Sequence, residues 1–184
     1  MKVLVVFAGC ILIGTGIWFV KEDEFVVRYT MHRLKHESRG GYILYYNERI
    51  VDLAPGAVSY LARIFRTDNL EPNCQYGVSL ALMSADPQLA RDLFLESLAG
   101  DGWQVRVSLL GLYQLKYLGA FEEAVPLKAH PDPLTRAALA RYLSLFSTQA
   151  SIAILQELAE DATSSVRSAA CRSLELVGGQ CLLN

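Results

Sequence analysis

The chain has 184 residues, of which 52% are hydrophobic and 20% are charged, so it is long enough for one apolar segment and one domain with its own core. Its formal net charge is −2, and this near-neutral balance gives no electrostatic basis for binding nucleic acid. Nucleic-acid-binding proteins are therefore the first class that the composition excludes.

An uncharged apolar run occupies residues 3–20, between Lys2 and the charged sequence that starts at Lys21. At about 1.5 Å per helical residue, a run of this length just crosses the hydrocarbon core of a bilayer. Trp18 lies near its end, where aromatic residues typically meet the membrane interface. We therefore expect residues 1–20 to be a single transmembrane anchor that contacts the lipid bilayer through residues 3–20.

Three alternatives to an anchor stay open at this point. A cleaved signal peptide also begins with a lysine and an apolar run, although the bulky residues that end this run do not resemble a cleavage site. A lipoprotein processing site at Cys10 is the second alternative, and a buried helix of a soluble domain is the third.

Two sequence signals predict different sides of the membrane for the domain. Lys2 before the run and the acidic residues directly after it favour a domain outside the cytoplasm. The basic residues between Arg28 and Arg39 favour the cytoplasmic side, because the positive-inside rule counts basic residues and largely ignores acids. We expect the exported, periplasmic side over the cytoplasmic side.

Residues 21–54 form a membrane-proximal segment that does not fit the pattern of the rest. Residues 25–31 alternate with a period of two, which is typical of a strand with one apolar face. After turn-forming residues at 37–41, residues 42–51 are rich in aromatic and β-branched side chains and suit a returning strand. A small β-hairpin is one interpretation, and a helix followed by an extended linker is the other.

Residues 55–184 contain copies of one motif at intervals of about 30 residues. The last copy, residues 161–178, begins with an acidic residue, followed by side-chain oxygens that can accept hydrogen bonds from the first backbone amides of a helix. Two small residues follow within the helix, and a Gly-Gly pair ends it. Between the last two copies, Arg136 aligns with Arg167 and Arg141 aligns with Arg172. A period near 30 with two helices per copy predicts an all-α fold, a right-handed α-solenoid of stacked helical pairs.

Helix signals divide this region further. Pro55-Gly56 introduces a capping helix over residues 57–66, and Pro126 cuts one second helix short. The expected pairs are 75–84 with 88–98, 105–118 with 120–125, and 134–146 with 149–160, followed by a last helix that ends near residue 177.

The motif of an acidic residue, Val-Arg, two small residues, Leu and Gly resembles the short HEAT-like repeats of bilin-lyase-type and many other bacterial helical-repeat proteins. The resemblance covers roughly residues 70–178 and is strongest in the last copy. It implies a ladder of Asp and Arg that fixes the stacking of successive repeats, on Asp101, Arg106, Asp132, Arg136, Asp161 and Arg167. Tyr76 stands in the arginine place of the first copy and departs from the pattern.

The remaining polar residues predict no catalytic or metal centre. His32 and His36 are four residues apart but have no third ligand, and His130 lies in a turn without a neighbouring nucleophile. We expect no cofactor, no metal ion and no enzymatic activity. A Cys171–Cys181 bridge is an open alternative if the domain is exported, since Cys171 otherwise suits a buried free thiol.

The function that we expect is a membrane-anchored protein-binding scaffold or an assembly subunit of a membrane complex. A solenoid presents a curved surface built from its second helices, and this surface suits a segment of another protein. The residues expected on it are Arg91, Asp92, Glu96, Glu122, Lys128, Gln156 and Glu157. The resemblance also implies an alternative, a lyase or chaperone-like activity on a tetrapyrrole chromophore. A third hypothesis is lipid or peptidoglycan sensing through residues 24–53.

Overall fold

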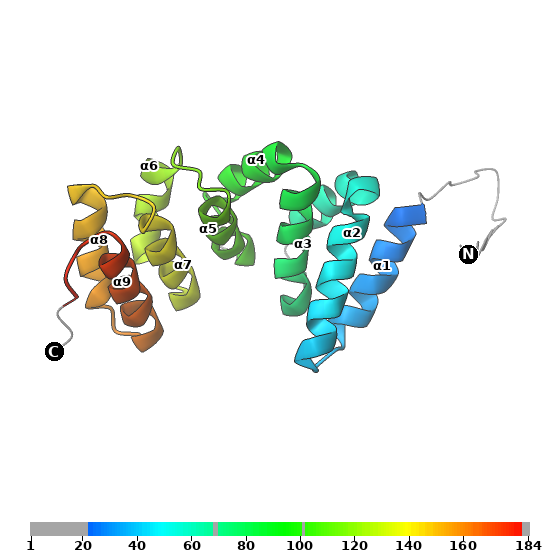
Figure 1. The fold of residues 1–184 in the computed structure, drawn as a ribbon, viewed down its shortest axis with the longest axis horizontal. Helices are drawn as coiled ribbons and strands as arrows, with labels where there is room; N and C mark the ends of the chain where they lie inside the picture. Colours follow the sequence, from blue (N-terminus) through cyan, green and yellow to red (C-terminus); the bar gives the residue numbers. More distant parts are fainter. Residues whose placement is uncertain (1–21, 68–69, 101, 182–184) are drawn as a thin grey trace.

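The computed structural model describes residues 22–67, 70–100 and 102–181, and every regular element in these ranges is helical. The helices follow one another along the long axis of the molecule in chain order (Figure 1). They are α1 (Glu22–Lys35), α2 (Gly40–Phe65), α3 (Pro72–Ala85), α4 (Pro87–Ser97), α5 (Trp103–Gln114), α6 (Phe121–Ala124), the 3₁₀ helix η1 (Val125–Ala129), α7 (Pro133–Leu143), α8 (Gln149–Ala159) and α9 (Ser164–Leu176). The prediction of an all-α fold is confirmed.

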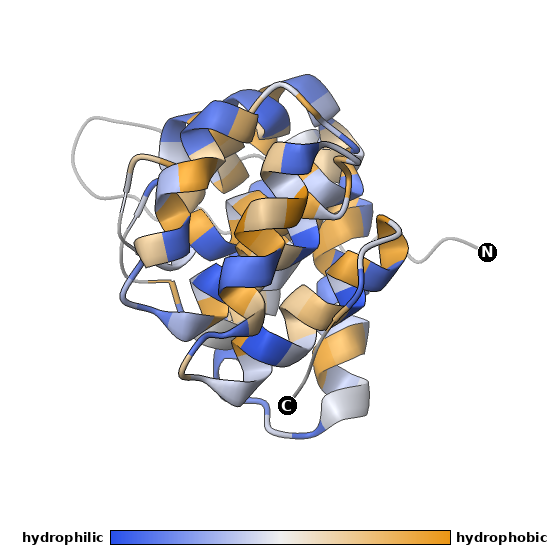
Figure 2. Cartoon of the chain, turned by 90° about the vertical axis from the view of Figure 1, so that its left-hand side faces the viewer, coloured by the Kyte–Doolittle hydropathy of each residue, from blue (hydrophilic) through white to orange (hydrophobic). Residues whose placement is uncertain are grey.

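Successive helical pairs stack in two rows. The first helices of the pairs, α3, α5, α7 and α9, contact one another in series and form the first-helix row. The second helices are α4, then α6 with η1, then α8, and they pack against the first helix of the following pair: α4 on α5, η1 on α7, and α8 on α9. The helices visible in Figure 2 carry both hydrophobic and hydrophilic residues along their turns. The buried apolar residues of the stack form one continuous core.

Two of the helices begin at an Asp-Pro pair. The Asp86 carboxylate accepts a hydrogen bond from the Leu89 amide at 2.9 Å, and Pro87 occupies the first turn, where a missing N–H is tolerated. Asp132 and Pro133 start α7 in the same way. These local signals explain why the boundaries of α4 and α7 lie close to the predicted ones.

The second helix of the pair that α5 begins is short, as predicted. α6 has only 4 residues and continues as the 3₁₀ helix η1, which contains Pro126. Proline has no N–H to donate to the preceding turn, so the α-helical hydrogen-bond pattern stops there. Ala124 and Leu127 are buried on either side of the change and keep this segment packed in the stack.

The hairpin expected within residues 24–53 is wrong, because α1 and most of α2 occupy this segment. Along α1 the buried residues are Val27, Thr30, Met31 and Leu34, which recur at helical spacing. The period of two describes the types of residue, whereas burial follows a period of three to four. The extended linker of the other interpretation is also wrong.

The helix start expected at Pro55-Gly56 is wrong as well, since Pro55 lies inside α2. Pro55 is exposed, and the absence of a side chain at Gly56 leaves room for the Asp23 side chain of α1. α2 also crosses the expected boundary between residues 21–54 and 55–184 and packs against both α1 and α3. The α1–α2 pair therefore continues the stack at its N-terminal end.

Residues 3–20, the expected membrane anchor, and Trp18 within them lie outside the described residues. In the described ranges, no helix combines the length and the apolar character needed to cross a bilayer.

α9 ends with a glycine in the left-handed conformation. Gly178 has φ 77°, and the amides of Gly178 and Gly179 donate back to the carbonyls of Glu175 and Leu174 at 3.3 Å and 2.8 Å. These two bonds form a Schellman motif, which turns the chain back along the helix. A disulfide from Cys181 to Cys171 on α9 holds the returning segment.

One close approach between helices depends on the absence of a side chain. Gly111 on α5 faces the ring of the fully buried Phe94 on α4, and a Cβ atom at position 111 would overlap that ring. The Phe65 ring contacts Phe94 and Trp103, with ring centroids 5.5 Å and 5.4 Å apart. This aromatic cluster joins α2, α4 and α5, so it has little freedom to move away from a methyl group.

We expect Gly111→Ala to lower the free energy of unfolding by roughly 1–2 kcal/mol, because the overlap with Phe94 outweighs the gain of about 1 kcal/mol in helix propensity. Gly41→Ala is the matched control: it lies near the start of α2 with no atom near its added Cβ, and it should be neutral or stabilising. Urea unfolding followed by circular dichroism measures both. Equal stability of the two variants would contradict a tight contact between α4 and α5.

Candidate functional site

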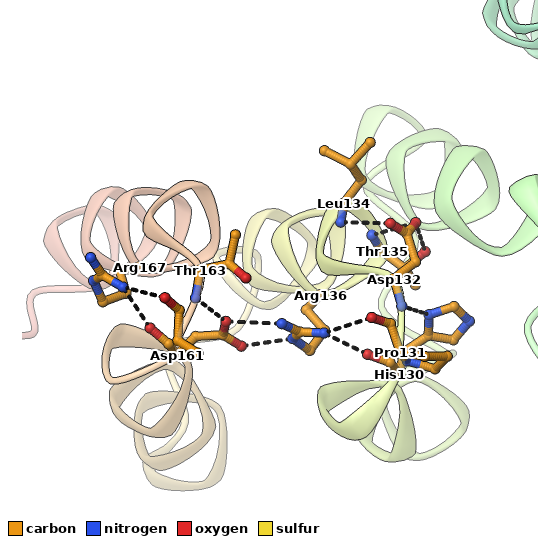
Figure 3. Close-up of polar contacts among 10 residues, drawn as sticks. His130, Pro131, Asp132, Leu134, Thr135, Arg136, Asp161, Thr163 and Arg167 are labelled. Atoms are coloured by element: carbon orange, nitrogen blue, oxygen red, sulfur yellow. Dashed lines mark hydrogen bonds and ion pairs between the residues drawn. The ribbon is translucent and has the colours of Figure 1, made fainter.

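A bidentate ion pair joins two neighbouring repeats. The Arg136 Nε and Nη2 atoms on α7 donate to the two carboxylate oxygens of Asp161, in the loop before α9, at 2.7 Å and 2.9 Å (Figure 3). The two side chains are only 15% and 11% exposed. The planar guanidinium fork matches the carboxylate in one orientation, so this pair fixes how the α9 layer sits on the α7 layer.

The same arginine also holds the loop in front of its own helix. Arg136 Nη1 donates to the carbonyl oxygens of His130 at 2.7 Å and Pro131 at 3.2 Å. Arg167 repeats this pattern one layer later, on the carbonyls of residues 161–162, at 2.8 Å and 2.9 Å. A positive charge in the first turn interacts unfavourably with the positive end of the helix dipole. The hydrogen bonds to these carbonyl oxygens compensate for this unfavourable interaction.

Asp132, at the start of α7, is the ladder residue next to Arg106 of the preceding repeat. Its carboxylate accepts hydrogen bonds from the backbone amides of Leu134 and Thr135 at 3.1 Å and 3.2 Å and caps α7. Burial acts to raise the pKa of Asp132, but these bonds, that of the Thr135 hydroxyl and the positive charge of Arg106 outweigh it and lower the pKa. Arg106 thus acts on Asp132 through its charge, and not through a bidentate ion pair of the kind that joins Arg136 to Asp161.

In the first copy, Gln75 rather than Tyr76 lies beside the next ladder residue. Gln75 Oε1 accepts a hydrogen bond from Arg106 at 2.9 Å, and its Nε2 donates to the Leu70 carbonyl at 2.9 Å. The sequence signal for this was a spacing of 31 from Arg106, which equals the spacing from Arg136 to Arg167. Asp101, the remaining ladder residue of the prediction, lies outside the described residues.

The polar residues expected to bind a partner lie on the second helices of the pairs, and we call them the second-helix row. They are Arg91, Asp92 and Glu96 on α4, Glu122 on α6, Lys128 on η1, and Gln156 and Glu157 on α8. Glu122 and Gln156 are exposed, but the other charged members form ion pairs within the chain.

These ion pairs connect neighbouring elements of the row. Lys128 on η1 pairs with Glu157 on α8 at 2.6 Å, and Arg66 at the end of α2 lies 3.4 Å from Glu96. Arg91 pairs with Asp92 at 2.7 Å, and its guanidinium also lies over the Tyr117 ring, 5.6 Å from the centroid. Much of the charge of the second-helix row is thus neutralised locally.

A groove that the sequence reading did not identify lies on the first-helix row, and we call it the α7–α9 groove. It has a volume of about 450 Å³ and is lined mainly by α9, with Arg141 of α7, Ser144 just after α7, and Tyr113 of α5. Its principal lining residues are Tyr113, Arg141, Ser165, Ser168, Arg172 and Leu176. The alignment of Arg141 with Arg172 at the repeat spacing was the available signal, but sequence alone does not show that both face one hollow.

A second hollow of about 490 Å³ lies between α4 and η1 and is mostly apolar. His130 lines it and is 8% exposed, and its Nδ1 accepts a hydrogen bond from the Asp132 amide at 3.1 Å. Its buried Nε2 has no hydrogen-bond partner among the described residues. The Nδ1 bond orients the ring within the turn before α7, and no serine or cysteine side chain lines the described part of this hollow.

The other residues with possible chemistry are dispersed. The exposed rings of His32 on α1 and His36 just after it pack edge to face, with centroids 5.6 Å apart. In the described ranges, no three His, Cys, Asp or Glu side chains are grouped so as to hold a metal ion. Burial raises the pKa of the Cys74 thiol to about 11, which keeps it protonated and unreactive near neutral pH.

The comparison with known families matches the part of the chain that contains the Arg136–Asp161 pair. Residues 122–180 match the family described as HEAT repeats. HEAT-like helical repeats therefore occupy this part of the chain. No curated protein and no solved structure matches it. The family match spans α6 to α9, where the repeat pattern in the sequence is also strongest.

We expect Arg136→Gln to lower the free energy of unfolding by about 2–3 kcal/mol, because it leaves the Asp161 carboxylate and two carbonyl oxygens without their donor. Arg141→Gln changes an exposed arginine on the same helix and should shift stability by less than about 0.5 kcal/mol. Denaturant unfolding of both variants measures the difference. A similar loss in both would show that the ion pair does not hold the layers together.

The Arg136 hydrogen bonds lower the pKa of Asp161 below its ordinary value. A carboxyl whose pKa is lower in the folded than in the unfolded state stabilises the fold above its unfolded pKa of about 3.9, and this contribution disappears as the pH falls through the folded pKa. We expect Asp161→Asn to be less stable than the wild type at pH 7, with a gap that narrows below about pH 4. Unfolding curves between pH 7 and pH 2 test this, and a gap that does not change with pH would contradict it.

Proposed function

We propose that this HEAT-like protein is a membrane-anchored scaffold that docks another protein of a membrane complex on its solenoid surface. The observation that carries the proposal is the stack itself, in which helical pairs in series present long rows of exposed polar residues. Surfaces of this kind suit extended or helical protein segments. The HEAT-repeat match supports a protein partner for the same reason.

The sequence supports the anchor. Residues 3–20 are uncharged and apolar, and α1 begins at Glu22, directly after this run. The stack therefore starts where the proposed span ends, and a membrane location needs no long linker. Trp18 would lie at the membrane interface in this arrangement.

The disulfide supports the exported, periplasmic side. The structure joins Cys171 to Cys181, with Cα atoms 5.1 Å apart, while Cys74 is buried as a free thiol. Disulfides persist in oxidising compartments and are rare in the cytosol. The acidic residues after the apolar run, Asp23 and Glu24 among them, agree with this side.

We propose a binding role rather than an enzymatic one. The acidic and basic residues that the ladder and the second-helix row contain are mostly engaged in contacts between helices and loops. The two hollows are open, and neither brings together a nucleophile and a base in the described residues. The chromophore alternative has no observation in its favour.

We expect the full-length chain, extracted from its membranes in mild detergent, to co-purify with at least one protein in fixed stoichiometry. Deletion of residues 3–20 should move the chain to the soluble fraction, and replacement of these residues by an unrelated apolar span should restore the membrane location. Fractionation and mass spectrometry measure both. Isolation of the chain alone, or with a coloured ligand, would contradict the scaffold, and a deletion variant that stays in the membrane would contradict the anchor.

A further inference from the structure

Two arginine positions repeat between α7 and α9, and the structure treats them differently. Arg136 and Arg167 are held by acceptors inside the stack. Arg141 and Arg172 are exposed, and neither guanidinium has an acidic partner among the residues that the structure describes. Both line the α7–α9 groove.

The groove has the form of a channel along α9. Ser165, Ser168, Arg172 and Leu176 line it and recur every three or four residues, so they form one stripe over most of the helix. At 1.5 Å per residue, this stripe is about 16 Å long, which matches about three turns of a second helix. The small serine side chains leave the hollow open between the two arginines.

The charge in the groove is unbalanced. No acidic side chain lines it in the described part of the chain, whereas the charges of the second-helix row are largely paired. Apolar surface accompanies the arginines, since Tyr113 lines the groove on the α5 side and Leu176 is 72% exposed at the end of α9. The groove therefore combines positive charge with apolar contacts.

We propose that the α7–α9 groove binds an acidic amphipathic helix of a partner protein. Carboxylates of that helix pair with Arg141 and Arg172, and its apolar residues contact Tyr113 and Leu176. Arginine forms bidentate hydrogen bonds with carboxylates, and a helix laid in a groove is a common mode of protein recognition. This inference rests on the proposed scaffold function and names the docking surface and the class of partner.

A random library of twelve-residue peptides tests the chemistry directly. The library is selected against the full-length chain in mild detergent, and the affinity of enriched peptides is measured by fluorescence anisotropy. We expect enriched peptides to carry at least two acidic residues together with apolar residues. We also expect their binding to weaken with added NaCl, because the contacts are between partly exposed charges.

Single and double variants locate the binding site. Arg141→Gln and Arg172→Gln should each weaken peptide binding by about tenfold, because each removes one charged hydrogen-bond donor. Arg49→Gln, at an exposed position of α2 that does not line the groove, is the matched control and should leave binding unchanged. Circular dichroism of all variants checks that the fold is kept. Enrichment of non-acidic peptides, no enrichment at all, or an equal effect of Arg49→Gln would overturn the proposal.

Photo-crosslinking in native membranes separates this inference from the scaffold function. A photoreactive residue replaces Ser168 in the groove or Gln156 in the second-helix row. Crosslinks to a protein from Ser168 that disappear in the double variant Arg141→Gln, Arg172→Gln support the groove. Protein crosslinks only from Gln156 overturn the groove and leave the scaffold intact, and no protein crosslink from either position counts against both. Crosslinks from Ser168 to lipid, or only to a second copy of this chain, also overturn the groove.

Discussion

The Arg136–Asp161 ion pair sets the geometry on which the stack depends. Apolar contacts between helices are not directional, so they alone allow one helical pair to slide or rotate on the next. The Arg136 guanidinium donates to the two Asp161 carboxylate oxygens at 2.7 Å and 2.9 Å, and this geometry allows only one orientation of the carboxylate. The same guanidinium also donates to the loop carbonyl of His130 in its own layer. Pairs of low exposure gain little net stability because both charges lose water. The contribution of this pair is therefore mainly to the register of the layers.

The helical part of the fold was predictable where the chain carries local signals. Asp-Pro pairs start α4 and α7, Gly178 ends α9, and Pro126 stops α6, and each acts through hydrogen bonds within a few residues. The N-terminal pair was not predictable in the same way. Its residue types alternate with a period of two, and only the packing of α1 against α2 and α3 shows that Val27 and Leu34 are the buried ones.

The candidate sites were also predictable only where the sequence carries a local signal. The spacing of the arginines was visible in the sequence, but the partner of Arg106 in the first copy was not, because Gln75 and the neighbouring Tyr76 are equally polar candidates at a period near 30. The α7–α9 groove was missed for a different reason. A groove results from small side chains on one helix face and from the absence of acidic neighbours in space, and neither property can be read from a single segment.

The positions of the two arginines along α7 explain why Arg136 is internal and Arg141 is exposed. Arg136 and Arg167 lie in the first turn, where the helix dipole is positive, so these cations need acceptors close by. Arg141 lies in the last turn of α7, where the dipole is negative and already favours a cation. It can remain exposed without a carboxylate from its own chain. In α7, one arginine is therefore satisfied at the loop that joins the layers, and another stays exposed at the C-terminal end of the same helix.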